Sequence, residues 1–134
     1  MKDIIFDDFQ NNVDESLIRH RSLLDIMTKL QESESRINRA IAKSVTNCGC
    51  ISVEAKKQKL PSKDSDLNIE NLSQCLQTHI KGKLCENCRD IIESEIGTNL
   101  FYLTSLCNTL GLNLYDILLK EYDKINTLGK YNLR

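Results

Sequence analysis

Apolar residues recur every three or four positions along two long stretches of the chain, residues 17–45 and 86–110. This spacing places them on one face of an α-helix, so each stretch is predicted to be an amphipathic helix. The first stretch is either one long helix or two helices with a break near Ser33. Because glycine readily adopts the left-handed conformation found after helix C-termini, Gly49 and Gly111 are predicted to follow the two helix ends.

Shorter helices are expected at the two ends of the chain. Residues 3–10 have the spacing of a short amphipathic helix, and Asp14 is a candidate N-cap for the helix that follows. Residues 113–126 are predicted to form the last helix, with Asn113 as its cap.

The middle of the chain is predicted to be mostly loop. Residues 51–67 are polar, rich in lysine and serine, and contain the only proline. A short helix is expected over residues 69–80, ending at Gly82. Strand signals are nearly absent. The sequence therefore predicts an all-α fold, an antiparallel bundle of about four helices.

Length and charge limit the classes of function. A chain of 134 residues is expected to form a single domain covering residues 1–134. Its 18 basic and 19 acidic residues give no overall positive field, so nucleic acid is not an expected partner. The sequence has no apolar run long enough to span a membrane, and its acidic N-terminus does not resemble a secretory signal. We therefore expect a cytoplasmic protein that does not bind membranes.

Six cysteines in a cytoplasmic protein favour metal binding or burial over disulfides. Four of them form two close pairs at the ends of the long predicted helices, Cys48 with Cys50 and Cys85 with Cys88. Zinc takes four thiolates in a tetrahedron, and two such pairs from separate segments are the usual way to supply them. We therefore predict a structural zinc ion that ties the two helices together and leaves residues 51–84 as an inserted excursion.

Two other states of these cysteines stay open, an iron–sulfur cluster and reduced thiols without a metal. Zinc is the interpretation we favour, because Gly49 gives the single-residue spacer of the first pair the freedom to turn. Cys75 and Cys107 lie beside leucines in predicted helices, so both are expected to be buried as small apolar side chains.

Polar side chains interrupt the apolar faces of both long helices. Glu34 interrupts the first, and Glu95 with Asn99 interrupts the second. Buried carboxylates are costly unless they are paired, protonated or bound to a cation. These residues are therefore expected either to reach solvent at the edge of the helix interface or to belong to a cation site.

The segments around these residues resemble the MazG-like all-α nucleoside triphosphate pyrophosphohydrolases. In the family, a Glu is followed, after two intervening residues, by an Asp, then by an apolar helix and a Leu-Gly-Ile-Asp-Leu turn. Residues 95–103 (EIGTNLFYL) and 106–114 (LCNTLGLNL) are similar to this segment. Residues 29–37 (KLQESESRI) are similar to its Lys-Leu helix, which bears two adjacent glutamates and a third three residues on. Residues 120–131 are similar to its basic C-terminal region near the substrate phosphates.

The resemblance implies a magnesium site that this chain has largely lost. In the family, at least four acidic side chains hold magnesium, which activates water at the triphosphate. By resemblance Glu32 and Glu95 stand at two acidic positions, whereas Ser33, Arg36 and Thr98 replace the others. Two carboxylates should bind magnesium weakly, so catalysis is expected to be degenerate. Arg36 is expected to take the metal's place by pairing with Glu95 or Glu32.

The favoured function is therefore binding of a nucleotide or of another protein, by a homodimer, since the family's helices pack across subunits. An active pyrophosphohydrolase is the alternative, in which magnesium would be held by Glu32, Glu34, Glu95 and Asn99. In that enzyme the substrate phosphates would be bound by Lys120, Lys124, Asn126 and Lys130. A second alternative is a zinc/thiol regulatory protein, in which the four paired cysteines are the functional centre.

Overall fold

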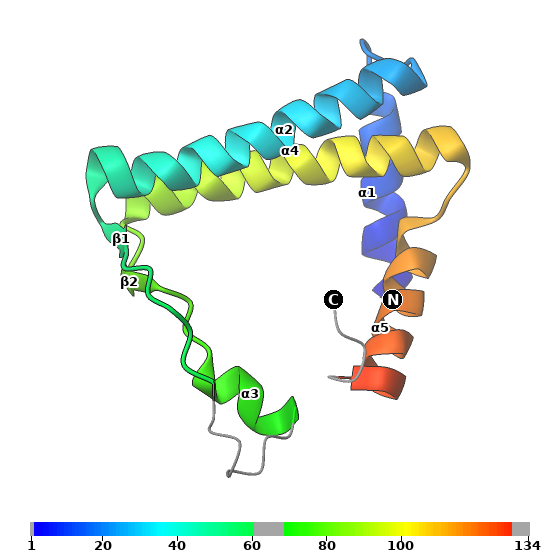
Figure 1. Cartoon of the computed structure of the whole chain (residues 1–134). Helices are drawn as coiled ribbons and strands as arrows, with labels where there is room; N and C mark the ends of the chain where they lie inside the picture. Colours follow the sequence, from blue (N-terminus) through cyan, green and yellow to red (C-terminus); the bar gives the residue numbers. More distant parts are fainter. Residues whose placement is uncertain (1, 61–68, 130–134) are drawn as a thin grey trace.

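The computed structural model describes residues 2–60 and 69–129 (Figure 1). Within these residues the chain is mostly helical, with one small antiparallel ribbon of two strands, so the prediction of an all-α protein is broadly confirmed. The elements in chain order are α1 (Lys2–Ser16), α2 (Leu23–Lys43), a π-helical turn η1 (Ser44–Cys48), β1 (Ile51–Val53), α3 (Ile69–Cys75), β2 (Ile80–Gly82), α4 (Glu86–Leu110) and α5 (Leu114–Leu128).

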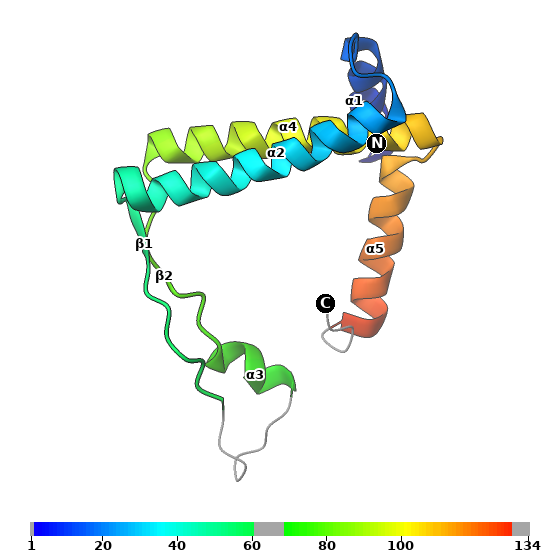
Figure 2. The ribbon, with the colours of Figure 1, turned by 45° about the horizontal axis from the view of Figure 1, so that its top comes forward.

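A hairpin of the two long helices, α2 and α4, forms the body of the molecule. They lie side by side and antiparallel along their whole length (Figures 1 and 2). Several of the residues buried in the molecule come from these helices and from η1, which are Ile26, Ser33, Ser44, Ile92, Thr104 and Ser105. Each of the four buried hydroxyls donates a hydrogen bond to a carbonyl oxygen of its own helix. Because these hydroxyls are paired, small polar residues are accommodated in the core at little cost.

At one end of this hairpin α1 crosses α4, whereas α5 turns away from the end of α4 and packs against α1 (Figures 1 and 2). Val13 and Leu17 supply the buried apolar contact of this end, together with Cys107 of α4. The predicted antiparallel four-helix bundle is therefore not confirmed. The structure has a two-helix hairpin with two helices at one end.

A buried amide pair joins α1 to the turn between α4 and α5. The Gln10 side chain donates to the Asn108 Oδ1 and the Leu112 carbonyl, and it accepts from the backbone N–H of Leu114. Asn108 in turn donates to the Gln10 carbonyl at 2.9 Å. These bonds link residues about a hundred positions apart, so no local pattern in the sequence could have predicted them.

The first predicted helix, residues 17–45, is wrong at its start. Helix α1 extends to Ser16, a connector follows, and α2 runs from Leu23 without a break at Ser33. Arg21 stabilises the end of α1. Its guanidinium donates to the carbonyl oxygens of Asp14 and Leu17 and pairs with the Asp14 carboxylate at 3.0 Å, so it satisfies carbonyl groups that the helix leaves unpaired. Asp14 therefore lies inside α1 and serves its C-terminal end, so its prediction as an N-cap is wrong.

The predicted ends of the second long helix are confirmed. Helix α4 spans Glu86–Leu110, and Gly111 follows it in the left-handed conformation at φ 69°. Gly49 likewise follows η1 at φ 76°. Asn113 caps α5, because its side chain accepts a hydrogen bond from the Asp116 N–H.

The excursion between the long helices forms a projecting arm, defined here as residues 51–84. Strands β1 and β2 pair antiparallel, with Ile51 opposite Gly82, and the arm leaves the hairpin at the end opposite α1 and α5 (Figure 1). The helix predicted over residues 69–80 is too long, because α3 ends at Cys75 and residues 80–82 form a strand. Residues 61–68 of the predicted loop lie outside the described residues.

None of the helices in the described part of the chain combines the length and apolar character needed to cross a lipid bilayer.

Candidate metal centre

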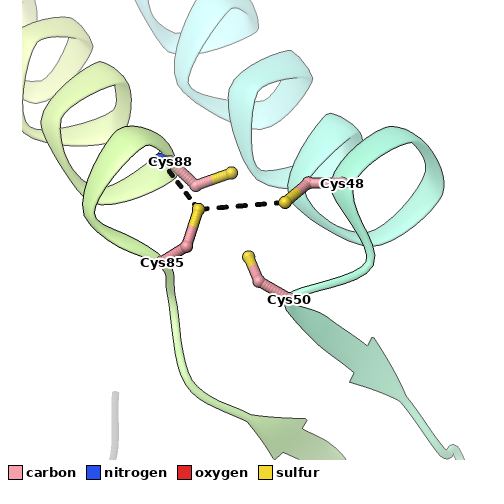
Figure 3. A group of neighbouring side chains, drawn as sticks. All are labelled: Cys48, Cys50, Cys85 and Cys88. Carbon is pink, nitrogen blue, oxygen red and sulfur yellow. Dashed lines mark hydrogen bonds between the residues drawn. The ribbon is translucent and has the colours of Figure 1, made fainter.

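The backbone at the tip of the hairpin presents four cysteines from two segments. Cys48 ends the π-helical turn, and Cys50 follows it after the left-handed Gly49, just before β1. Cys85 occupies the N-cap position of α4, and Cys88 lies in the first turn of the same helix. Figure 3 shows the four sulfur atoms pointing toward a common centre.

The distances between these sulfurs fit a single tetrahedral metal ion. All four Sγ atoms lie within 4.8 Å of one another, and the Cys48 and Cys85 Sγ atoms are 3.8 Å apart. A zinc–sulfur bond of about 2.3 Å places the sulfurs of a tetrahedron about 3.8 Å apart. A disulfide needs a separation of about 2.0 Å, and all four cysteines are free thiols. The four predicted metal ligands are thus brought together by the fold.

The start of α4 favours a thiolate at Cys85. The Cys88 backbone N–H donates to the Cys85 Sγ at 3.4 Å, and this bond, with a further one from the Cys88 thiol, lowers the pKa of Cys85 to about 7. The Ser44 side chain lowers the pKa of Cys88, but the neighbouring Cys85 sulfur and burial outweigh this effect and raise it to about 12. The Cys85 sulfur is therefore close to ionisation at neutral pH, whereas a cation would have to ionise Cys88.

The other cysteines and the histidines stand apart from this cluster. Among the described residues, these four cysteines are the one group of at least three Cys, His, Asp or Glu side chains close enough to hold a metal. Cys107 is 4% exposed, and burial raises the pKa of its thiol, as expected for a small apolar core residue. Cys75 is half-buried in the arm, so its predicted burial is only partly realised.

The acidic residues of the hairpin lie about a separate opening between α2 and α4. Glu32 and Glu95 both line a cavity of about 240 Å³. Asn99 lies at the helix interface instead, where its amide donates to the Ser33 Oγ at 3.0 Å. Glu34 is exposed and does not line the opening, as expected for a residue at the edge of the interface.

The charge of this opening is close to balanced. Lys29 and Arg36 line it as well, and each forms an ion pair with Glu32, at 3.3 Å and 3.2 Å. Lys29 first, and then Arg36, hold the pKa of Glu32 below its usual value. Because the Arg36 side chain is 61% exposed, the expected pairing with Glu32 is a surface ion pair, which contributes little to stability.

The basic residues predicted to bind phosphates are not brought to this opening. Lys120, Lys124 and Asn126 are exposed on α5, and none of them lines it. Lys124 instead pairs with Glu121 at 3.9 Å. Lys130 lies outside the described residues.

Sequence reasoning missed one further feature, a cavity in the arm lined by several lysines. The sequence indicates part of this cavity through the closely spaced Lys56, Lys57 and Lys59, but from the sequence alone these lysines indicate only a polar loop.

Comparison of the chain with models of protein families, with curated proteins and with solved structures gave no match.

Proposed function

We propose that this chain is a zinc-binding helical protein that acts by binding rather than by catalysis. The observation that supports it is the convergence of four cysteine sulfurs within 4.8 Å at the tip of the hairpin. An iron–sulfur cluster inserts several atoms between its cysteine ligands, so it needs wider spacing than a single ion does. The close spacing therefore favours zinc.

The role of this zinc is structural. Four thiolates fill a tetrahedral coordination sphere and leave no position for water or substrate, which is the difference between structural and catalytic zinc sites. Cys48 and Cys50 come from the end of η1 and the residue before β1, and Cys85 and Cys88 come from the start of α4. Zinc would thus join α2, α4 and the base of the arm.

Metal analysis of the purified protein tests this proposal. We expect one zinc per chain by native mass spectrometry, and loss of zinc in Cys85→Ser because a ligand is removed. The matched control is Cys75→Ser, which changes a cysteine outside the cluster and should retain zinc. Wild-type protein that binds no zinc when it is refolded with the metal would refute the zinc site.

We further propose that the hairpin is a MazG-like scaffold that works as a homodimer. The resemblance of residues 29–37 and 95–114 supports the family assignment, and the large accessible surface supports the dimer. The chain exposes 10488 Å², whereas a folded monomer of 15.4 kDa is expected to expose about 7,200 Å². Obligate dimers bury about 1,000–2,500 Å² per chain, so the excess is large enough to supply such an interface as well as the surface of the projecting arm.

Nucleotide hydrolysis is the second candidate, because Glu32 and Glu95 share one opening. Against it, magnesium would have to compete with Lys29 and Arg36 for the Glu32 carboxylate. Nucleotide binding without turnover is the outcome that we propose for this opening, since its two cations can meet phosphate oxygens.

Incubation with nucleoside triphosphates and magnesium or manganese separates the two candidates. We expect binding at most, with no release of pyrophosphate. Pyrophosphate release that is lost in Glu95→Gln but retained in Cys75→Ser would establish the enzyme instead.

A further inference from the structure

The arm contains a concave site that the zinc proposal does not use. Its volume is about 580 Å³, within the range of small-molecule sites. Lysines line it from both sides of the arm, Lys56, Lys57 and Lys59 from the segment after β1 and Lys81 from β2. In Figures 1 and 2 the two segments run side by side from the ribbon toward α3.

The charge of this cavity is strongly positive in a chain whose net charge is −1. Among the residues that the structure describes in the arm, the four lysines share the lining with one carboxylate, Glu54. Ammonium groups gathered in one concavity repel one another, so this arrangement costs free energy unless an anion occupies it. Stability of the fold therefore gives no reason for these lysines to be together, whereas binding of an anion does.

Hydrogen bonds hold the two walls of the cavity at a set separation. The Gln58 side chain pairs with the backbone of Gln77 in both directions, donating to its carbonyl and accepting from its N–H at 2.9 Å each. The Glu54 N–H donates to the His79 carbonyl at 2.8 Å. The site is thus built by contacts between segments about 20 residues apart.

His79 adds a backbone feature typical of ligand sites. It lines the cavity and adopts a φ of 61°, in the left-handed region that residues other than glycine rarely occupy. Such conformations cost free energy and concentrate at binding sites, where surrounding contacts hold them.

We propose that this arm cavity binds a polyphosphate chain of about three phosphates, either free or carried by a nucleoside. Lysine ammonium groups bind phosphate oxygens as point charges, and four of them match the charge of a triphosphate. None of the described lining residues is Phe, Tyr or Trp, so the cavity offers no large aromatic ring on which a base would stack. The phosphate chain is therefore the part of the ligand that is recognised.

Isothermal titration of the zinc-loaded full chain with sodium tripolyphosphate tests the proposal. We expect tripolyphosphate to bind at the arm cavity, separately from the nucleotide binding proposed for the opening between α2 and α4, and this binding should weaken with added salt. The double variant Lys57→Ala/Lys59→Ala should weaken binding by about tenfold or more. The matched control Arg19→Ala/Lys83→Ala removes the same charge from residues that do not line the cavity, and it should bind within about threefold of wild type.

Two further measurements serve as controls for this titration. Zinc content after the titration must equal that before it, because tripolyphosphate also chelates metals. ATP should bind within about threefold of tripolyphosphate, since the base makes no stacking contact. Absence of tripolyphosphate binding, equal loss in both double variants, or much tighter binding of ATP would overturn the assignment.

Discussion

Gly82 is the residue where the arm and the metal centre constrain each other most directly. It has a φ of 87°, and a Cβ added there would lie 2.5 Å from the Cys50 carbonyl oxygen. Residues other than glycine rarely adopt this backbone conformation. The Cys50 carbonyl oxygen is also part of the backbone, so it cannot rotate away as the end of a flexible side chain could. The close approach of the two strands beside Cys50 therefore depends on glycine at position 82.

Gly82→Ala should lower the free energy of unfolding by about 1–3 kcal/mol, because it adds backbone strain and pushes against Cys50. It should also weaken zinc binding by displacing a ligand. Urea denaturation and zinc titration measure the two effects. The control is Gly97→Ala in α4, where an added Cβ meets nothing within 4 Å and alanine should stabilise the helix by about 0.5–1 kcal/mol. Equal stability of the two variants would refute this account of Gly82.

At the scale of elements, the hairpin is held at its two ends by different chemistry. The end near α1 and α5 is held by apolar burial and by the hydrogen bonds between the buried Gln10 and the half-buried Asn108. The opposite end has the buried Ser44 and Ile51 and the cysteine cluster. The two ends should therefore respond independently to removal of the metal.

A zinc chelator should raise amide hydrogen exchange by about tenfold or more at residues 44–53 and 82–90, because the metal joins these segments. Exchange around Gln10 and Leu114 should stay nearly unchanged. Mass spectrometry of exchanged peptides measures both regions in one experiment. Faster exchange along the whole chain would show instead that the metal supports the entire fold.

For the whole molecule, the excess accessible surface is accompanied by apolar side chains in helical register. Ile96, Leu100 and Leu103 share one face of α4, and Leu118, Tyr122 and Ile125 share one face of α5. All six are more than a third exposed. Large exposed apolar faces usually mark an interface, so these faces are where we expect the proposed dimer to form.

Sedimentation should therefore give twice the chain mass of 15.4 kDa at micromolar concentration. Tyr122→Glu should raise the dissociation constant of the dimer by about tenfold or more, because it buries a charge in the apolar face. Thr127→Glu introduces the same charge on the polar face of α5 and should leave the dimer intact. A wild-type monomer under these conditions would contradict the proposal.

Features with a local cause were predictable. The spacing of apolar residues predicted both long helices, and Gly49, Gly111 and Asn113 marked helix ends that the structure confirms. The spacing of the cysteines predicted the cluster, because the two cysteines of each pair are brought close by one turn of backbone. For Glu34 the sequence left two alternatives, the edge of the interface or a cation site, and the structure places it exposed, outside the opening.

Features that depend on contacts between distant residues were not predictable in the same way. The ribbon between residues 51–53 and 80–82 has weak strand character, and only the pairing of its two segments makes it a strand. Lys81 meets the lysines of residues 56–59 only because the chain folds back on itself. Helix spacing, helix ends and the cysteine pairs are properties of neighbouring residues, so the amino-acid order determined them. The ion pairs around Glu32 are local as well, because they join residues three and four positions apart on α2. The placement of α1 and α5 at one end of the hairpin and the charged arm cavity arise from long-range packing, and only the tertiary structure could decide them.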